Sequence, residues 1–216
     1  MKLHITHKNL LDIINLYYKC FYPALDFVGK KEFLSIINSF KFKKKIFFPF
    51  PIYLSISQNK YNLIKNEKIV DAYYSSKKIC KLQIKSFFKL NKKQVGEKLF
   101  KTKNKKHPGL KDFLNAGEYF VDCSIKKFNK KIMKNINFTK PSDLKSYFSK
   151  KKIKKIVGFH TRNVPHKAHE WIHSYGLKKC KNLLIHPLIG QFKKGEYKED
   201  TVIKSNYKII KDIYKN

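Results

Sequence analysis

The residues best suited to chemistry lie in one stretch, V-G-F-H-T-R-N-V-P-H-K-A-H-E-W-I, at positions 157–172. Arg162 within it is the only arginine of the chain, and lysine supplies every other strongly basic side chain. A planar guanidinium donates two parallel hydrogen bonds to an oxyanion, which a lysine ammonium cannot do. A single arginine among threonine, asparagine and histidine therefore predicts a clamp for phosphate or sulfate.

Two histidines follow this arginine at a spacing of three, His166 and His169. At the start of a helix, both side chains project from one face, where backbone amides and the helix dipole favour an anion. Thr161 and Asn163 add further hydrogen-bonding groups. This set of residues suits phosphoryl or nucleotidyl transfer, in which catalysis consists mostly of positioning and of stabilising charge on oxygens.

A metal site is the main alternative interpretation, because His166, His169 and His173 form a stripe at helical spacing. The familiar zinc helix places its two histidines four apart with a glutamate after the first, and Lys167 occupies that place here. We therefore predict no metal site and assign His173 to packing. The other alternative, exposed helix histidines without a role, is disfavoured by the arginine in the same loop.

Composition limits the class of protein. The 216 residues suffice for one large domain or two smaller ones, and the formal net charge is +34. Lysines are spread along the chain without an arginine-rich or glycine/aromatic RNA-binding pattern, which favours a solvated lysine surface over a nucleic-acid site. The four widely spaced cysteines, and the lack of a signal peptide or long apolar run, predict a cytoplasmic protein that contacts no membrane.

Residues 1–140 are predicted to form an α+β or barrel-like domain. Asn9 is expected to cap a first helix, a second helix is expected at 30–40, and a turn at His107-Pro108-Gly109 is expected to precede one helical turn. Short apolar segments separated by polar turns predict strands at 47–56, 61–65, 68–74, 79–85 and 118–124.

Residues 141–216 change to an α/β pattern. Ser142 is expected to cap a helix to about 148, and a terminal helix is expected at 198–214. Between them the pattern predicts a strand at 153–159, a polar loop at 160–165, a helix at 165–177 and a strand at 183–186. Such a unit makes a parallel pair of strands with a right-handed crossover, and ligands bind at the carboxyl ends of the strands.

The central stretch also resembles a known family. G-F-H-T-R-N-V-P-H-K-A-H-E is similar to the Q-T-R-N-P-x-H-x-x-H-E signature of ATP sulfurylase. Further matches follow in the same order along the chain: Y-P-A-L-D-F-V-G at 22–29, F-P-F-P-I at 48–52, H-P-G at 107–109, L-I-H-P-L-I-G at 184–190 and K-K-G-E-Y at 193–197.

The resemblance implies a PUA-like domain at 1–140, followed at 141–216 by part of an α/β, Rossmann-like nucleotidyltransferase domain of the HxGH superfamily. In the family, sulfate attacks the α-phosphate of MgATP and gives adenylyl sulfate and pyrophosphate. By resemblance, Thr161, Arg162 and Asn163 bind sulfate and the α-phosphate, while His166 and His169 steady the triphosphate and the leaving pyrophosphate. ATP with Mg²⁺ and sulfate are thus the implied substrates, with no resident metal.

Two departures from the family pattern leave alternatives open. His160 stands where the family has a glutamine that helps to hold sulfate, which predicts a sharper pH dependence or another oxyanion as substrate. The second family motif, G-R-D-H, does not occur, and two strands cannot cover both faces of a parallel sheet. We therefore expect a fragment that needs the missing catalytic half or another copy as partner. A non-catalytic, PUA-like nucleic-acid-binding module is the remaining alternative.

Overall fold

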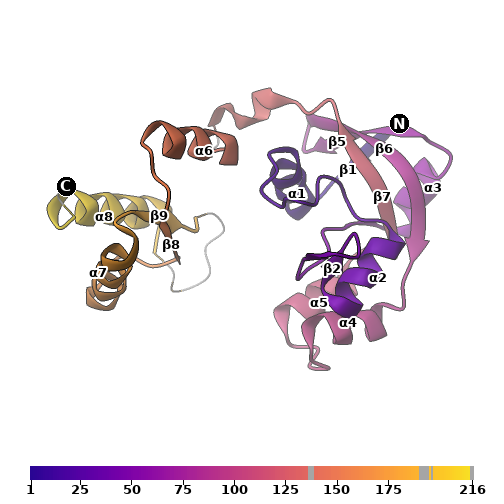
Figure 1. The fold of residues 1–216 in the computed structure, drawn as a ribbon. Helices are drawn as coiled ribbons and strands as arrows, with labels where there is room; N and C mark the ends of the chain where they lie inside the picture. The colour runs from indigo at the N-terminus through magenta and orange to yellow at the C-terminus, as the bar shows by residue number, and fades with distance from the viewer. Residues whose placement is uncertain (136–138, 190–194, 196, 215–216) are drawn as a thin grey trace. The chain divides into compact units, whose positions relative to one another are not determined.

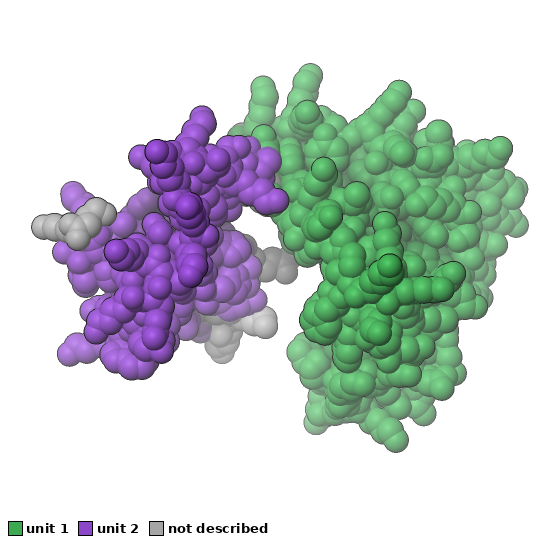
Figure 2. Space-filling model, viewed as in Figure 1, with its two compact units in different colours: residues 1–141 green, residues 142–216 purple. Residues whose placement is uncertain are grey.

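The computed structural model describes residues 1–135, 139–189, 195 and 197–214, and the chain divides into two compact units. Unit 1 comprises Met1–Pro141 and unit 2 comprises Ser142–Asn216 (Figure 2). Each unit has its own sheet.

Unit 1 is built on a five-stranded sheet in the order β1-β5-β6-β7-β4 (Figure 1). The first strand is parallel to its neighbour, and the other pairs are antiparallel. Register shifts between Ala72 and Tyr73 and between Ile84 and Ser86 mark irregularities that increase local twist. The strands are β1 (Lys2–His4), β4 (Leu54–Ile56), β5 (Ile69–Tyr74), β6 (Lys77–Lys89) and β7 (Tyr119–Lys126), with a separate small hairpin of β2 (Lys41–Phe42) and β3 (Ile46–Phe47).

Each helix of unit 1 contributes buried apolar side chains to the core that it shares with this sheet. In Figure 1, α2, α4 and α5 lie beside the small hairpin. Helix α4 contacts both α2 and α5. The helices are α1 (His7–Tyr17), α2 (Lys30–Ser39), α3 (Gln58–Ile64), α4 (Lys92–Phe100) and α5 (Pro108–Asn115), with a 3₁₀ helix, η1, at Lys130–Asn135. The predicted mixture of helices and a mixed sheet in this half of the chain is confirmed.

The first helix begins three residues earlier than expected. Thr6, not Asn9, is its N-cap, and the Thr6 hydroxyl accepts from the Asn9 backbone amide at 3.2 Å. The Asn9 carboxamide in turn accepts from the Thr6 backbone amide at 3.3 Å. The two residues thus form a reciprocal capping box, and the prediction identified the wrong member of the pair.

Two strand predictions in this unit are wrong. Residues 61–64 belong to α3 and Lys65 is its C-cap, because Ser57 caps a helix there and its hydroxyl accepts from the Lys60 amide. The expected strand at 47–56 is present only at its ends, in β3 and β4. Pro49 and Pro51 between them lack the amide hydrogen that a strand ladder requires.

The other predicted elements of unit 1 are present with shifted ends. The expected strands at 68–74, 79–85 and 118–124 correspond to β5, β6 and β7, and the helix at 30–40 corresponds to α2. His107 caps α5, and its Nδ1 accepts from the Leu110 amide at 3.3 Å, while Pro108 fills the first helical turn. The predicted turn at 107–109 is therefore the start of a helix of eight residues.

A cluster of aromatic rings forms the centre of the unit 1 core. Phe120 on β7 is fully buried and contacts four other rings at centroid distances of 5.5 to 5.9 Å. These rings come from α2, the segment before β4, β6 and α5: Phe33, Tyr53, Phe88 and Phe113. One side chain therefore joins α2 and α5 to the sheet.

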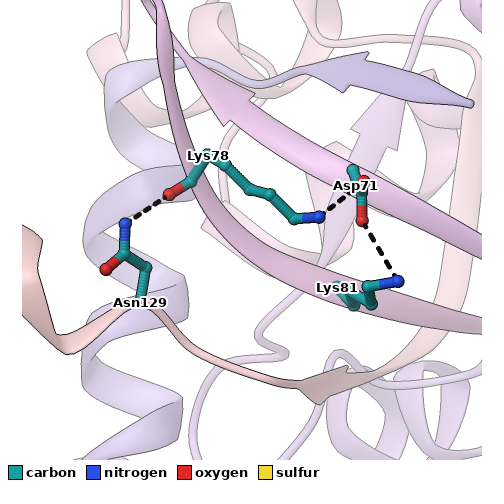
Figure 3. Close-up of polar contacts among 4 residues, drawn as sticks. All are labelled: Asp71, Lys78, Lys81 and Asn129. Atoms are coloured by element: carbon teal, nitrogen blue, oxygen red, sulfur yellow. Dashed lines mark hydrogen bonds and ion pairs between the residues drawn. The ribbon is translucent and has the colours of Figure 1, made fainter.

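Polar side chains link β5 to β6, and β6 to the segment that follows β7 (Figure 3). Lys78 Nζ donates to Asp71 Oδ2 at 2.6 Å, and this hydrogen bond is the main reason that the pKa of Asp71 is lowered. Lys81 approaches the other carboxylate oxygen at 4.0 Å. The side chain of Asn129 donates to the Lys78 carbonyl at 2.9 Å, so the segment after β7 is attached to β6.

The amine of Lys92 holds the end of α5. Its Nζ donates to the carbonyl oxygens of Leu114 and, at 2.6 Å, of Ala116. Replacing Lys92 with methionine is expected to destabilise unit 1 by about 1–3 kcal/mol, because two helix-end carbonyls lose a charged donor. Urea denaturation monitored by circular dichroism measures the change. Lys93→Met, at an exposed neighbouring position, is the control and should leave the midpoint unchanged.

Unit 2 contains a pair of parallel strands with a helix between them, as predicted. The strands β8 (Val157–Thr161) and β9 (Leu183–Pro187) pair in register from Val157 with Leu183 to Thr161 with Pro187. The helices are α6 (Pro141–Lys150), α7 (Lys167–Cys180) and α8 (Glu199–Asp212). The first of these begins at Pro141, so Ser142 lies inside it and is not the cap that we expected.

The crossover helix covers one face of this small sheet. The ring of His173 on α7 lies 4.3 Å from that of Phe159, and Gly176 lies against Val157. Residues that alternate with these, Gly158 and His160, face the other way. Both are exposed, and a Cβ added at Gly158 would find nothing within 4 Å. Within the described residues, one face of the parallel pair is thus left open, as the element pattern predicted.

Candidate active site

The polar residues of the central stretch lie where β8 ends and α7 begins. Both elements start later than expected: the strand occupies Val157–Thr161 instead of 153–159, and the helix occupies Lys167–Cys180 instead of 165–177. His160 and Thr161 are therefore strand residues, which corrects their placement in a loop at 160–165. Arg162 and Asn163 follow directly and are exposed.

Thr161 organises the turn after the strand. Its hydroxyl accepts from the Asn163 amide at 3.0 Å, and its carbonyl accepts from the Leu188 amide at 2.7 Å. The side chain is buried, unlike those of the two residues that follow. In this arrangement the threonine fixes the direction in which Arg162 leaves the sheet, and its hydroxyl is already engaged with the backbone.

His166 and His169 lie side by side at the start of α7, as their spacing predicted. His166 is the N-cap residue and makes no side-chain capping hydrogen bond, and His169 lies one turn into the helix. Their rings are stacked with centroids 3.9 Å apart and an interplanar angle of 30°. Burial, and secondly the neighbouring His166, lower the pKa of His169, so His169 is neutral near pH 7.

His173 is a core residue of unit 2, which agrees with its assignment to packing. It is 1% exposed, and its Nδ1 lies 2.8 Å from the Tyr214 hydroxyl. Its Nε2 is buried and has no hydrogen-bond partner among the described residues. Burial is the main cause of the lowered pKa of His173 and of the raised pKa of Tyr214. Sequence reasoning missed Tyr214, which lies 41 positions away.

These two histidines make unit 2 sensitive to acid. Because burial disfavours their protonated forms, the unfolded chain takes up protons at His169 and His173 more readily than the folded chain does. Their contribution to stability is present above the ordinary pKa of 6.5 and is lost as pH falls toward the lowered values. We expect the melting temperature of unit 2 to fall between about pH 7.5 and about pH 5.

Calorimetry across this pH range checks the prediction. His173→Asn should reduce the pH dependence of the unit 2 transition, whereas His7→Asn in unit 1 should leave that transition unchanged. An equal pH dependence in the wild type and in His173→Asn would contradict the assignment of this histidine.

A further contact at the site was not predicted. His186 on β9 is the register partner of His160, and their Nδ1 atoms are 3.2 Å apart. The predicted strands could have indicated this contact. His160 directly follows the strand expected at 153–159, and His186 ends the strand expected at 183–186, so parallel pairing brings the two histidines close together. Among the described residues, no group of three or more histidine, cysteine or acidic side chains has a geometry that could hold a metal ion.

Comparison with known proteins shows which families the two parts of the chain resemble. Residues 1–130 match the family model of the PUA-like domain, and residues 136–216 match that of ATP-sulfurylase. The chain thus combines a PUA-like domain with a region similar to ATP-sulfurylase. The resemblance found in the motifs is thus confirmed, and the N-terminal unit is a PUA-like domain.

Similar curated proteins are sulfate adenylyltransferases. That of Pyrococcus abyssi is 27% identical over 214 residues, which are 99% of this chain and 55% of the relative. Those of Thermococcus onnurineus and Persephonella marina are 26% and 29% identical, over 97% and 91% of this chain and 55% and 52% of the relatives. The chain therefore spans about half the length of the curated relatives that it matches.

A solved structure shares the fold over nearly all of the chain. It is a hexameric APS kinase from Thiobacillus denitrificans, with a TM-score of 0.67 and 12% sequence identity, and the match covers 98% of this chain and 38% of that one. At this identity the match shows the fold alone. In the described part of the chain, no helix has the length and apolar character needed to cross a membrane.

Proposed function

We propose that unit 2 carries the anion-binding half of a sulfate adenylyltransferase site, which converts ATP and sulfate to adenylyl sulfate and pyrophosphate. The observation that carries the proposal is the position of Arg162 and Asn163 between the carboxyl end of β8 and the two stacked histidines that begin α7. This is the edge of a parallel sheet at which α/β folds bind ligands.

The reaction needs charge to be held on oxygen atoms. A sulfate oxygen forms a bond to the α-phosphorus of ATP, the bond from that phosphorus to the bridging oxygen breaks, and pyrophosphate leaves with the bonding electrons. Arg162 is proposed to hold sulfate and the α-phosphate through its parallel N–H groups, with Asn163 and His160 as additional polar contacts. Mg²⁺ enters with ATP as part of the substrate and is not a resident metal.

The start of α7 is proposed to receive the triphosphate. His166 leaves the first amides of the helix uncapped by its side chain, so these amides and the helix dipole face the ligand. His169 is neutral near pH 7 and acts as a hydrogen-bond donor to the leaving pyrophosphate, not as a permanent cation. The fixed positive charge of the site then comes from the arginine.

The proposal includes an assignment of the two domains to known folds. We assign 1–140 to the PUA-like domain and 141–216 to part of a Rossmann-like nucleotidyltransferase domain of the HxGH superfamily, on the basis of the parallel β8–α7–β9 unit. The open face of that sheet is proposed to be covered by the remaining strands and helices of such a domain, or by another copy of the chain.

Pyrophosphate-dependent formation of ATP from adenylyl sulfate tests the function. The chain is mixed with a segment of the Pyrococcus abyssi relative that lies beyond the matched residues, and ATP is measured by luminescence. ATP formation that requires both parts supports the proposal. Its absence with the complementing segment present would contradict any adenylyl transfer at this site.

The identity of residue 160 favours one second candidate, adenylyl transfer to an oxyanion other than sulfate. A histidine at this position changes the hydrogen-bonding groups available to the anion relative to a glutamine. Pyrophosphate release from ATP, measured with sulfate and with phosphate in parallel, separates the two substrates. A non-catalytic nucleic-acid-binding role stays a prediction, and RNA binding that vanishes near physiological salt would reduce it to charge attraction.

A further inference from the structure

Two lysine-rich segments of unit 1 that are far apart in the sequence lie next to each other in the structure. They are 40–47, F-K-F-K-K-K-I-F, and 101–106, K-T-K-N-K-K, and neither contains an acidic residue. The first runs from the C-cap of α2 through the hairpin of β2 and β3, and the second begins at the C-cap of α4 (Figure 1). The Nζ atom of Lys101 lies 6.0 Å from the centre of the Phe40 ring, so the two segments meet there.

Apolar side chains are exposed among these lysines. Phe47 is 72% exposed, and Phe40 and Ile46 are 41% and 42% exposed. The rings of Phe40 and Phe47 are 6.1 Å apart at an interplanar angle of 40°. A group of exposed apolar side chains with a charged rim is typical of an interaction site.

The hairpin holds its lysines at defined backbone positions. Phe42 is buried beneath it and contacts Phe48 at a ring distance of 5.6 Å, and the Lys43 amide donates to the Glu32 carboxylate at 2.7 Å. Lys43 and Lys44 have φ angles of 48° and 63°, in the left-handed region that lysine rarely adopts. The turn therefore presents consecutive lysines to solvent although glycine or asparagine would form it with less strain.

The second segment is ordered by its own hydrogen bonds and leads to a hollow in the surface. The Asn104 amide donates to the Thr102 hydroxyl at 3.1 Å, and the Asn104 side chain accepts from the Lys106 amide at 2.9 Å. The hollow has a volume of about 420 Å³ and is lined by Lys105, Lys106, Lys111, Leu114 and Asn115. A positively charged surface thus continues from the hairpin along the loop to α5.

The fold supplies no counter-charge for this surface. In the part of the chain that the structure describes, no ammonium group of the two segments forms an ion pair with a carboxylate. Every lysine of both segments is exposed. Clustered like charges without internal partners attract a ligand that carries several negative charges.

The shape and the exposed rings select one kind of polyanion. A bilayer is flat on this scale, so its headgroups cannot follow the hollow beside α5. An acidic peptide matches the charge, but acidic side chains have no flat ring to stack on Phe47. A single-stranded nucleic acid supplies both a row of phosphates and unpaired bases whose faces stack on exposed aromatic rings.

We propose that segments 40–47 and 101–106 of unit 1 bind single-stranded nucleic acid, with phosphates along the lysines and an unpaired base stacked on Phe47. The inference concerns unit 1 and does not depend on the adenylyl transfer proposed for unit 2. In the sequence the lysines are spread along the chain. Contact between α2 and α4 gathers these two segments into one surface.

Fluorescence anisotropy of the full chain with a labelled oligouridylate of about 15 nucleotides tests the proposal. We expect saturable binding that persists near physiological ionic strength. A duplex of the same length hides its bases, and polyglutamate of the same length has none, so both should compete about tenfold less well than the unlabelled single strand.

A triple substitution in the hairpin tests the phosphate contacts. Lys43→Gln, Lys44→Gln and Lys45→Gln together should weaken binding about tenfold or more, and should reduce the slope of log affinity against log salt by about 2. The matched control replaces three consecutive exposed lysines of unit 2, in residues 150–152, with glutamine. It removes the same charge elsewhere, so affinity and slope should stay close to the wild-type values.

Phe47→Ala tests the stacked base. The affinity should fall about tenfold while the salt slope stays unchanged, because stacking is lost and every phosphate contact remains. Tyr207→Ala is the control, since Tyr207 is a similarly exposed ring, at 70%, in unit 2 and should be dispensable. Both rings lie at the surface, so both variants are expected to fold.

Four results would overturn the proposal. An equal loss in the two triple variants would show general charge attraction, and equal competition by duplex or polyglutamate would show that bases are not recognised. Sedimentation with phosphatidylglycerol vesicles that requires Phe47, with oligonucleotide binding that does not, would assign the surface to a membrane. Photocrosslinking of the wild type with iodouridine-containing RNA needs no variant: we expect crosslinks at 40–47, and crosslinks confined to other segments would refute the site.

Discussion

Arg162→Lys is expected to reduce pyrophosphate-dependent ATP formation by about 100- to 1,000-fold in the assembled protein. A lysine keeps the charge but replaces a rigid, planar donor pair with one mobile ammonium, so the two oxygens of sulfate and α-phosphate lose their common clamp. Arg162 lies beyond the end of β8 and is exposed, so the substitution should leave the unfolding of unit 1 unchanged. The luminescence assay and titration with sulfate measure the two effects.

A charge substitution just before β8 is the control for Arg162→Lys, which changes a residue just after β8. Lys155→Gln removes a positive charge just before β8, where the backbone carbonyl of Lys155 accepts from Asn182 and the side chain is exposed. This variant should retain the wild-type rate within about twofold, because it lies outside the proposed site. Retained turnover in Arg162→Lys would contradict the clamp, and an equal loss in Lys155→Gln would indicate a general effect of charge.

Phe120→Ala is expected to destabilise unit 1 by about 3–5 kcal/mol. The side chain is fully buried and contacts rings from two helices and from another strand, so its removal leaves a cavity that rigid aromatic neighbours cannot fill. Denaturation in urea should show a lower midpoint with an unchanged slope.

Phe47→Ala is the matched control for this prediction. Phe47 is the same residue type in the same unit but is 72% exposed, so its truncation should change the free energy of unfolding by less than about 0.5 kcal/mol. A small effect of Phe120→Ala, similar to that of the control, would contradict its place at the centre of the core.

The sequence predicted helices and strands correctly where the hydrophobic period of a segment agreed with the turn and capping residues at its ends. The parallel strands around a helix in unit 2 followed from two short apolar runs and a polar loop, and the strands at 68–74 and 118–124 followed from β-branched and aromatic residues. The failure at 61–65 has an identifiable cause. A short apolar run fits a strand or a helix equally well, and Ser57, four residues before it, decided for the helix by capping it.

The boundaries of β8 show a different limit. The apolar residues from Ile153 predicted an earlier strand, but the ladder begins at Val157, where Leu183 becomes available as a partner. Pairing partners, not composition, determine where a strand starts. This shift of the start and end moved His160 and Thr161 from the predicted loop into the strand, and thereby oriented one of them to the open face and buried the other.

The sequence by itself identified the residues that we propose to bind the anion: one arginine, two histidines at helical spacing and a strand-loop-helix pattern that brings them to a sheet edge. Only the tertiary structure decided which side chains meet across elements. His160 meets His186 through the register of two strands, and His173 on α7 meets Tyr214 in the segment that follows α8. The reason is physical. Local spacing fixes the face on which a side chain lies, but contact between residues 26 or 41 positions apart depends on how the elements pack.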